Sequence, residues 1–241
     1  MTNPLPPVLY EDEHVIAFDK PSGLLVAPDR WDKELENLMD LVHAQRSPDW
    51  FNAHRIDAGT SGVLLCAKTK PALDRLCLQF ERHQVRKEYL ALTRRAPRED
   101  RVRVERAIAP DPQHDGRMKA TSRGKRCETE FEVLERFRGF ALVKCIPVTG
   151  RTHQIRVHLA YLGCPIVGDP LYGDGRGFLL SEVKRRYKHK DEPERPMMGR
   201  LALHAESLAF THPATGEPMT IRAPLPKDFE LSLKYLRRFA G

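Results

Sequence analysis

One stretch of the chain places a carboxylate and a guanidinium beside a turn and an apolar run. Arg55 and Asp57 stand two residues apart, and the small residues 58–62 that follow are typical of a turn. The apolar run 63–67 is typical of a buried strand. We therefore expect Asp57 on a loop held by a strand, where an ionised carboxylate can act as a nucleophile or a general base.

Apolar patterns predict the elements that hold this loop. The opening is β-rich, with strands expected at 8–10 and 14–18 and strand character again at 24–26. Apolar residues at helical spacing predict a helix over 32–45. After the loop, Thr69 can cap a second helix that ends near His83.

The second half of the chain continues this mixture. A strand is expected at 88–93, and 128–137 with 140–148 should form a hairpin around Arg138 and Gly139. Thr152 can cap a helix that Gly163 ends, with Arg156 on a different side from its apolar stripe of Ile155, Leu159 and Leu162. Residues 174–200 are expected to be a surface insertion, with room for a short helix through 179–187. The last strands are expected at 201–204, 208–210 and 219–221.

Composition limits the classes of protein to consider. A chain of 241 residues can form one large domain or two small ones. The net charge of +7 favours a polyanionic partner without settling it, and residues 94–126 hold eleven Lys or Arg against five Asp or Glu. That segment is either a solvated surface or one that touches phosphates.

Cysteine usage and the N-terminal residues indicate the compartment. Five cysteines lie in or beside apolar runs and form no C-x-x-C pair, so we expect reduced core residues of a cytoplasmic protein. The chain shows neither an export signal nor a stretch of membrane-spanning length.

Three familiar chemistries do not fit the sequence. Residues 62–69 approach a phosphate-binding P-loop, but Ala67 replaces its second glycine and the interior is apolar. His153 and His158 lie on different helical faces and no cysteine quartet exists, so we expect no metal site. Ser61 lacks the glycine spacing of an esterase nucleophile.

Five motifs, in chain order, resemble those of the RluA family of RNA pseudouridine synthases. Residues 53–68 resemble its H-R-[LI]-D-x-x-T-S-G signature, with Ile56 in place of the commoner leucine. The other four are the K-P-S-G-L-L opening motif within 11–26, K-x-Y-x-A at 87–91, T-G-R-T-H-Q-I-R-V-H-L with P-I-x-G-D and Y-G over 149–173, and L-H-A with L-x-F-x-H-P over 201–213. Together they span almost the whole chain.

The resemblance implies an α+β pseudouridine synthase fold with a mixed, mostly antiparallel central sheet, flanking helices and a central catalytic cleft. It makes Asp57 the catalytic carboxylate and Arg55 the arginine that fills the space left when the target base flips out. Tyr89 matches the tyrosine that packs against uracil, and Arg156 matches the arginine that pairs with the catalytic carboxylate. We expect this isomerisation to need neither a metal nor a cofactor.

The resemblance also sets expectations for domains and RNA contact. We expect residues 1–241 to form one catalytic domain without the S4 RNA-binding domain of many relatives. RNA contact would then fall to the synthase domain itself, and the candidates are Arg123, Lys125, Arg126, Lys184, Arg185 and Arg186. We expect ribosomal RNA as the substrate, with tRNA as the alternative, and a monomeric protein.

Two other classes stay open at this stage. A non-catalytic RNA-binding protein would keep the fold and the charge, although the intact Arg55, Asp57, Tyr89 and Arg156 argue against it. A phosphodiesterase that uses His54 or His153 would shorten RNA, whereas isomerisation leaves its length and mass unchanged. For His54, His153 and His158 we favour structural roles.

Overall fold

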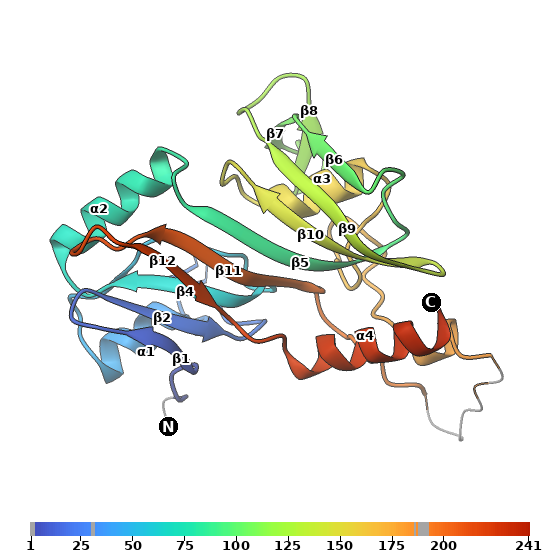
Figure 1. Ribbon diagram of the computed structural model, residues 1–241, viewed down its shortest axis with the longest axis horizontal. Coiled ribbons are helices and arrows are strands. Elements are labelled where there is room, and N and C mark those ends of the chain that lie inside the picture. Colours follow the sequence, from blue (N-terminus) through green and yellow to red (C-terminus); the bar gives the residue numbers. More distant parts are fainter. Residues whose placement is uncertain (1–2, 30–31, 186, 188–192) are drawn as a thin grey trace. The chain divides into compact units, whose positions relative to one another are not determined.

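The chain divides into two compact units. The computed structural model describes residues 3–29, 32–185, 187 and 193–241. The first unit comprises Met1–Lys87 and Ala205–Pro224, and the second comprises Glu88–His204 and Leu225–Gly241 (Figure 1). That residues 1–241 form one catalytic domain stays a prediction.

The first unit combines a sheet with two helices. Its strands follow the order β1-β2-β4-β11, with β3 paired to β4 and β12 to β11. The strands are β1 (Val8–Glu11), β2 (Val15–Lys20), β3 (Phe51–Asn52), β4 (Ser61–Ala67), β11 (Leu203–Thr211) and β12 (Pro218–Arg222). The helices are α1 (Leu38–Gln45) and α2 (Lys70–Glu81). The pairs β1–β2, β2–β4, β3–β4 and β11–β12 are antiparallel.

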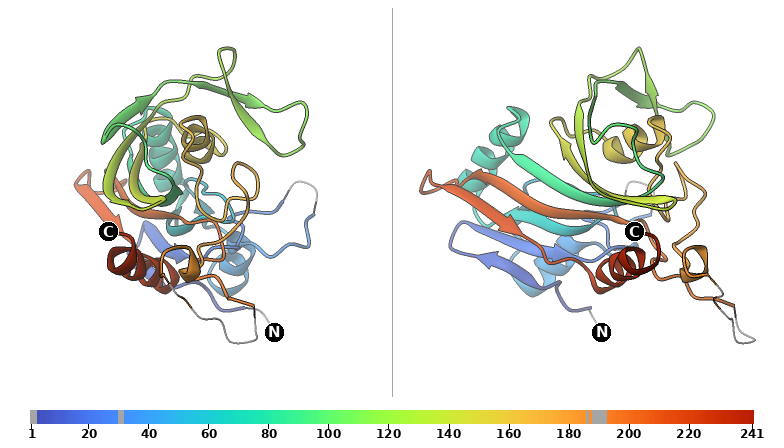
Figure 2. Two further views of the ribbon diagram at one scale, coloured as in Figure 1. Left: turned by 90° about the vertical axis from the view of Figure 1, so that its right-hand side faces the viewer. Right: turned by 45° about the vertical axis from the view of Figure 1, so that its right-hand side comes forward.

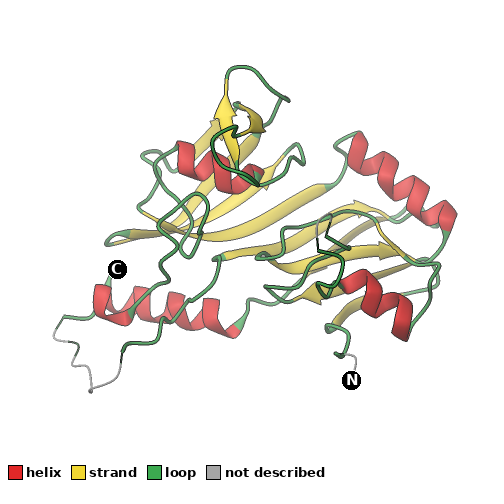
Figure 3. Cartoon of the chain, turned by 180° about the vertical axis from the view of Figure 1, so that it is seen from behind, coloured by secondary structure: helices red, strands yellow, loops and turns green. Residues whose placement is uncertain are grey.

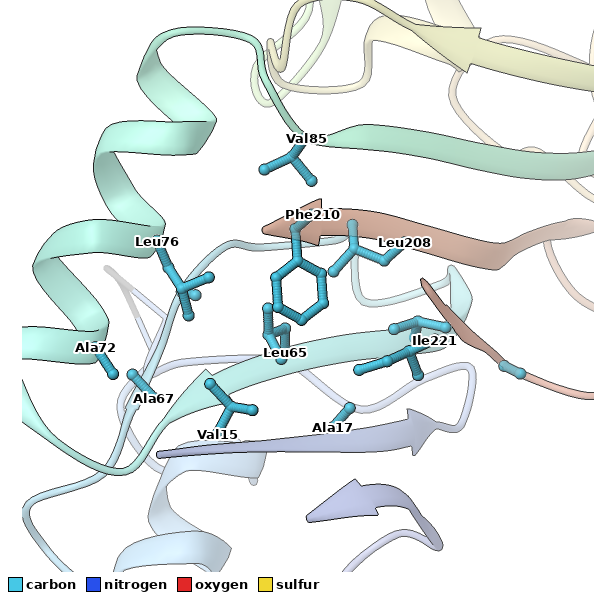
Figure 4. Packing of buried hydrophobic residues seen from close by; sticks show 13 residues of the cluster. Val15, Ala17, Leu65, Ala67, Ala72, Leu76, Val85, Leu208, Phe210 and Ile221 are labelled. Atoms are coloured by element: carbon cyan, nitrogen blue, oxygen red, sulfur yellow. The ribbon is translucent and has the colours of Figure 1, made fainter. Parts of the chain in front are cut away.

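One cluster of the core of this unit lies between the sheet and α2. Figure 4 shows Leu65 of β4 and Phe210 of β11 beside Leu76 of α2. Every residue of β4 is buried, which explains its unbroken apolar run. Burying one side chain of this size contributes about 1.5–3 kcal/mol, so the cluster anchors the strand that follows the Asp57 loop.

Helix α2 confirms its prediction, whereas α1 begins later than expected. Thr69 caps α2 through its side chain, which accepts a hydrogen bond from the Ala72 N–H. Helix α1 begins at Leu38 behind Asn37, so the predicted helix over 32–45 is wrong in its first part. The Asn37 side chain accepts a hydrogen bond from the Asp40 N–H. This fixes the N-terminus of α1 at Leu38, because an N-cap residue lies outside helical geometry.

Residues 24–26 do not form the expected strand. Leu25 makes only an isolated parallel bridge to Asn37. Its carbonyl accepts the Leu38 N–H at 2.9 Å, and the Val26 carbonyl accepts the Met39 N–H at 3.0 Å. The first N–H groups of a helix have no partner within it, and this segment supplies two.

The described residues of the second unit form one larger sheet, a separate strand pair, two α-helices and one short 3-10 helix. Its larger sheet has the order β5-β10-β9-β6, while β7 and β8 pair only with each other. The strands are β5 (Arg86–Arg94), β6 (Arg101–Val104), β7 (Ala107–Pro110), β8 (Met118–Thr121), β9 (Thr129–Phe137) and β10 (Phe140–Pro147). The helices are α3 (Gln154–Tyr161), α4 (Lys227–Phe239) and the short 3-10 helix Leu180–Glu182. Figure 2 shows the green β7–β8 hairpin extending beyond β9 and β10.

Several predictions for this unit are confirmed and several are wrong. The β9–β10 hairpin forms as expected, with Gly139 at φ +82° in its turn. Thr152 does not cap α3, because His153 occupies the cap position in the left-handed region and makes no side-chain cap bond. Within the described part of 179–187, the structure shows a 3-10 turn at Leu180–Glu182 in place of the short helix. The strands expected at 201–204 and 208–210 are one strand, β11.

Helix α4 was not expected from the sequence. Phe229, Leu233 and Leu236 are buried at i, i+4 and i+7, a spacing that could have revealed it. Helix α3 packs on β8, β9 and β10, and Figure 3 shows both helices in red. The α+β class with a mostly antiparallel sheet is confirmed.

The close approach of β4 to β11 at Gly62 can be tested by adding a side chain there. Its φ is +108°, and an added Cβ would lie 2.2 Å from the Ala205 carbonyl oxygen. We predict that Gly62→Ala lowers the free energy of unfolding by about 3 kcal/mol or more, from overpacking plus left-handed strain. Urea unfolding checks this value.

Gly139→Ala is the matched control, because Gly139 has φ +82° but nothing within 4 Å of an added Cβ. Its free energy of unfolding should fall only by the cost of left-handed strain, about 1–2 kcal/mol. Equal losses in the two variants would show that the close approach at Gly62 costs nothing.

Candidate functional site

The Asp57 loop is a tight turn that leads into the buried strand β4. The Thr60 N–H donates to the Asp57 carbonyl at 3.0 Å, and Thr60 and Ser61 are buried where β4 begins. Within the loop Ile56 is buried, Asp57 is half-buried and Arg55 is exposed. The geometry therefore leaves Asp57 and Arg55 accessible from a fixed turn.

Lys20 holds this turn from the end of β2. Its side chain is fully buried, and its ammonium donates to the carbonyls of Pro21 (2.9 Å), Leu24 (2.7 Å) and Ala58 (3.0 Å). Three carbonyls match the three N–H donors of an ammonium group. A buried charge costs free energy unless such partners surround it, so the turn and the loop must stay together.

Two neighbours of Lys20 add to the same contact. The Ser22 hydroxyl donates to the Gly59 carbonyl at 2.6 Å, and the Gly23 N–H donates to the Ala58 carbonyl at 2.8 Å. Gly23 has φ +96°, a conformation that L side chains rarely adopt. The K-P-S-G motif is thus a support for the Asp57 loop, a role that sequence reasoning missed.

His54 connects the other end of the loop to β4. Its Nε2 accepts the Leu65 N–H at 3.1 Å, and its ring stacks on Phe80 with centroids 4.9 Å apart. Burial, with the nearby Lys87 ammonium, lowers the pKa of His54 to about 3. A neutral ring that is hydrogen-bonded to the backbone supports a structural role for His54. A phosphodiesterase that uses His54 as its catalytic histidine is therefore disfavoured.

The two other histidines are also held by neighbours. His158 is fully buried, with Nδ1 at 2.9 Å from the Thr129 hydroxyl and Nε2 at 3.0 Å from the Arg106 carbonyl. His153 Nδ1 lies 2.8 Å from the Tyr172 hydroxyl. Both contacts fit the structural roles that we favoured.

Arg156 lies in the second unit and binds a carboxylate that the sequence did not suggest as a partner. Its Nε and Nη2 donate to the two oxygens of Asp169, both at 2.8 Å. Arg156 is 6% exposed and Asp169 is fully buried. The expected pairing of Arg156 with Asp57 stays a prediction.

Asp169 is ionised because of its surroundings. Burial raises its pKa, but the hydrogen bonds and charge of Arg156, with the N–H groups of Leu171 and Tyr172, outweigh burial and hold the pKa below its ordinary value. Asp169 is the last residue of the P-I-x-G-D motif. The backbone turn that follows it was the signal that could have identified it from the sequence. Asp169 is therefore a missed residue of this site.

Tyr89 lies on β5, opposite Cys145 of β10. Its side chain is 9% exposed, so most of it packs against the protein. Arg55 and Asp57 belong to the first unit, whereas Tyr89 and Arg156 belong to the second. The joint site that the resemblance implies for these four residues stays a prediction.

The basic candidates differ in exposure. Arg123, Lys125 and Arg126 are exposed in the segment that follows β8. Lys184 is half-buried over the rings of Tyr187 and Phe239, and Arg185 is exposed. Arg186 lies outside the described residues.

The described residues offer neither a metal cluster nor a membrane-spanning helix. Within those ranges, no group of three or more His, Cys, Asp or Glu side chains is arranged to hold a metal ion. None of the helices in the described part of the chain is long and apolar enough to cross a membrane.

Solved structures define the class of protein. The chain superposes on human RNA pseudouridylate synthase domain containing 4 with a TM-score of 0.72 and 29% identity, covering 95% of this chain and 92% of that one. Human RNA pseudouridylate synthase domain containing 1 gives a TM-score of 0.70 and 29% identity, covering 91% and 83%. The fold is that of pseudouridine synthases.

Sequence comparisons identify the family. Residues 14–161 match the family model described as RNA pseudouridylate synthase. Ribosomal large subunit pseudouridine synthase C of Salmonella typhi is 38% identical over 235 residues, covering 95% of this chain and 70% of that protein. Synthase D of Xanthomonas campestris pv. campestris is 38% identical over 243 residues, covering 95% and 69%. The chain belongs to the RluA family of RNA pseudouridine synthases, and the predicted isomerase acting on RNA is confirmed.

Lys20→Met tests whether the ammonium holds the Asp57 loop. Methionine keeps the length of the side chain but leaves the carbonyls of Pro21, Leu24 and Ala58 without this donor. We predict a loss of about 3 kcal/mol in the free energy of unfolding and slower isomerisation by the folded fraction. Urea unfolding and a single-turnover assay measure the two effects.

Lys70→Met is the control, because the Lys70 ion pair with Asp74 is exposed. An exposed pair of this kind contributes about 0.5 kcal/mol or less. If Lys20→Met were as mild as Lys70→Met, the loop would not depend on the ammonium.

Proposed function

We propose that the protein isomerises uridine to pseudouridine in ribosomal RNA of the large subunit, with Asp57 as the essential carboxylate. The observation that carries this proposal is the 38% identity, over 95% of the chain, to proteins named ribosomal large subunit pseudouridine synthases C and D. Transfer RNA is the alternative substrate. A cytoplasmic location and a monomeric state remain part of the proposal.

The reaction needs a carboxylate more than any other group. Isomerisation breaks the N1–C1′ bond, turns the base and rejoins it through C5, so no electrons leave or enter. Asp57 must be ionised to act as a nucleophile or base, and the half-exposed position on a rigid turn suits that role. Holding a reacting group in place is itself worth several kcal/mol of the barrier.

The other site residues have proposed roles around the flipped base. Base flipping costs a few kcal/mol, which the exposed Arg55 would offset by occupying the vacated stack. Tyr89 would stack on uracil, and its hydroxyl would assist removal of the C5 proton. Arg156 would pair with Asp57 and hold the carboxylate in place for the reaction.

Asp57→Asn tests the central assignment. The amide keeps the shape of the carboxylate but neither attacks nor accepts a proton, so we predict a loss of about a thousand-fold or more in rate. Tritium release from RNA labelled at uridine C5 measures it, on ribosomal and transfer RNA from cells that lack the enzyme. Release from ribosomal RNA alone supports the proposed substrate, and release from transfer RNA alone favours the alternative.

Asp49→Asn, at an exposed aspartate outside the loop, is the control and should keep full activity. RNA binding should persist in Asp57→Asn, because the carboxylate is proposed to act in the reaction and not in docking. Activity of Asp57→Asn within ten-fold of the wild type would contradict the catalytic role.

Charge removal tests the proposed RNA surface. We predict that replacing Arg123, Lys125 and Arg126 together by Gln weakens RNA binding and reduces the slope of log K against log salt by about 2–3, one counterion per phosphate contact. Filter binding across a salt series gives the slope.

A matched triple change removes the same charge from exposed positions of α4: Lys227, Lys234 and Arg238 to Gln. Its slope should fall by less than about 1 if those residues touch no phosphate. Equal slopes for the wild type and the Arg123–Arg126 variant would remove this segment from the RNA surface.

A further inference from the structure

Tyr172 contacts both the site arginine and the first residue of β8. Its ring centroid lies 5.0 Å from Cζ of Arg156, and its hydroxyl accepts the Met118 N–H at 2.8 Å. The side chain is 8% exposed, so both contacts lie out of bulk water. One buried side chain therefore touches both Arg156 and the strand that precedes the proposed RNA-contact residues.

The ring end of Tyr172 is fixed through Asp169. Oδ1 of Asp169 accepts the Tyr172 N–H at 3.1 Å while it also accepts Nη2 of Arg156 at 2.8 Å. The carboxylate thus sets both the guanidinium and the backbone of the tyrosine. A cation over an aromatic ring gains more when water is excluded, as it is at this buried site.

The hydroxyl end of Tyr172 is fixed by His153. Nδ1 of His153 lies 2.8 Å from the hydroxyl, which can donate there while it accepts the Met118 N–H. His153 has φ +56°, an uncommon conformation for a residue with a side chain. The left-handed position of His153 at the start of α3 points its ring to Tyr172, with centroids 5.6 Å apart.

The same tyrosine forms part of the apolar layer under the β7–β8 hairpin. Ile108, Cys127, Val157 and Tyr172 form a buried cluster, against which Met118 packs. Arg117, just before β8, has its Cζ 5.6 Å from the Tyr172 ring. The exposed Lys119 lies on β8, and the proposed RNA-contact residues follow the strand.

We propose that Tyr172 is a positioning residue that couples the β7–β8 hairpin, and the basic segment 123–126 that follows it, to Arg156. Its hydroxyl sets where β8 begins and hence where that basic segment meets RNA, and its ring holds the guanidinium of Arg156. The coupling rests on the proposed roles of Arg156 and of the basic segment. The two ends of one side chain then serve two different steps, docking and reaction.

Tyr172→Phe and Tyr172→Leu separate the two ends. Phenylalanine loses the hydroxyl and keeps the ring, so the half-saturating concentration should rise about five-fold with the rate constant within about two-fold. Leucine also loses the ring, so the rate constant should fall about ten-fold in addition. Single-turnover tritium release, with enzyme varied in excess over the RNA, yields both constants.

Hydrogen exchange gives a readout that needs no substrate. Amides of residues 107–121 should exchange faster in Tyr172→Phe, whereas those of the β9–β10 hairpin should not change. Unchanged exchange at 107–121 would overturn the inference. A fall in rate constant as large in Tyr172→Phe as in Tyr172→Leu would also overturn it, because the ring would then not be the group that holds Arg156.

A purely structural role predicts a different result. Both variants would then lose thermal stability and active fraction, with no split between the two constants, and this outcome also overturns the proposal. Faster exchange in Tyr172→Phe, with no tritium release by the wild type from any RNA, would instead overturn the proposed function and with it the coupling to Arg156.

Discussion

The buried ammonium of Lys20 is the constraint on which the Asp57 loop depends. An ammonium group out of water is tolerated only where oxygen atoms surround it, and the carbonyls of Pro21, Leu24 and Ala58 do so. Those carbonyls converge on one point only when the turn after β2 and the loop before β4 adopt a single arrangement. A loop of small residues, which would otherwise be mobile, thereby becomes a rigid support for a reacting carboxylate.

The second unit also holds a buried charged group among fixed partners, but there the buried group is negative and its partners are N–H donors. There the buried group is the Asp169 carboxylate, and its partners are Arg156 and two backbone N–H groups. Gly168 precedes it at φ +73°, and an added Cβ would lie 2.1 Å from the Arg200 carbonyl oxygen. Each unit thus combines a buried charge with a glycine at a close backbone approach, for example Gly62 in the first unit and Gly168 in the second.

Local sequence patterns predicted those elements whose limits are set locally. Helix α2 has its cap at Thr69 and its apolar stripe within twelve residues, so periodicity was sufficient. The errors occur where a contact with a residue far away in the sequence determines the local structure. Residues 24–26 resemble a strand, but the carbonyls of Leu25 and Val26 accept the first N–H groups of α1. His153, whose ring contacts Tyr172, takes the cap position expected for Thr152.

The same distinction applies within the site. A resemblance of motifs can identify Asp57, because the loop motif itself contains the reacting group. The supports cannot be read in this way: Lys20 reaches Ala58 across 38 residues, and Tyr172 reaches Met118 across 54. Nothing in the local sequence says that a lysine will be buried or that a tyrosine hydroxyl will meet a strand. A motif residue without a role in the reaction is therefore best understood as half of a contact whose other half lies far away in the sequence.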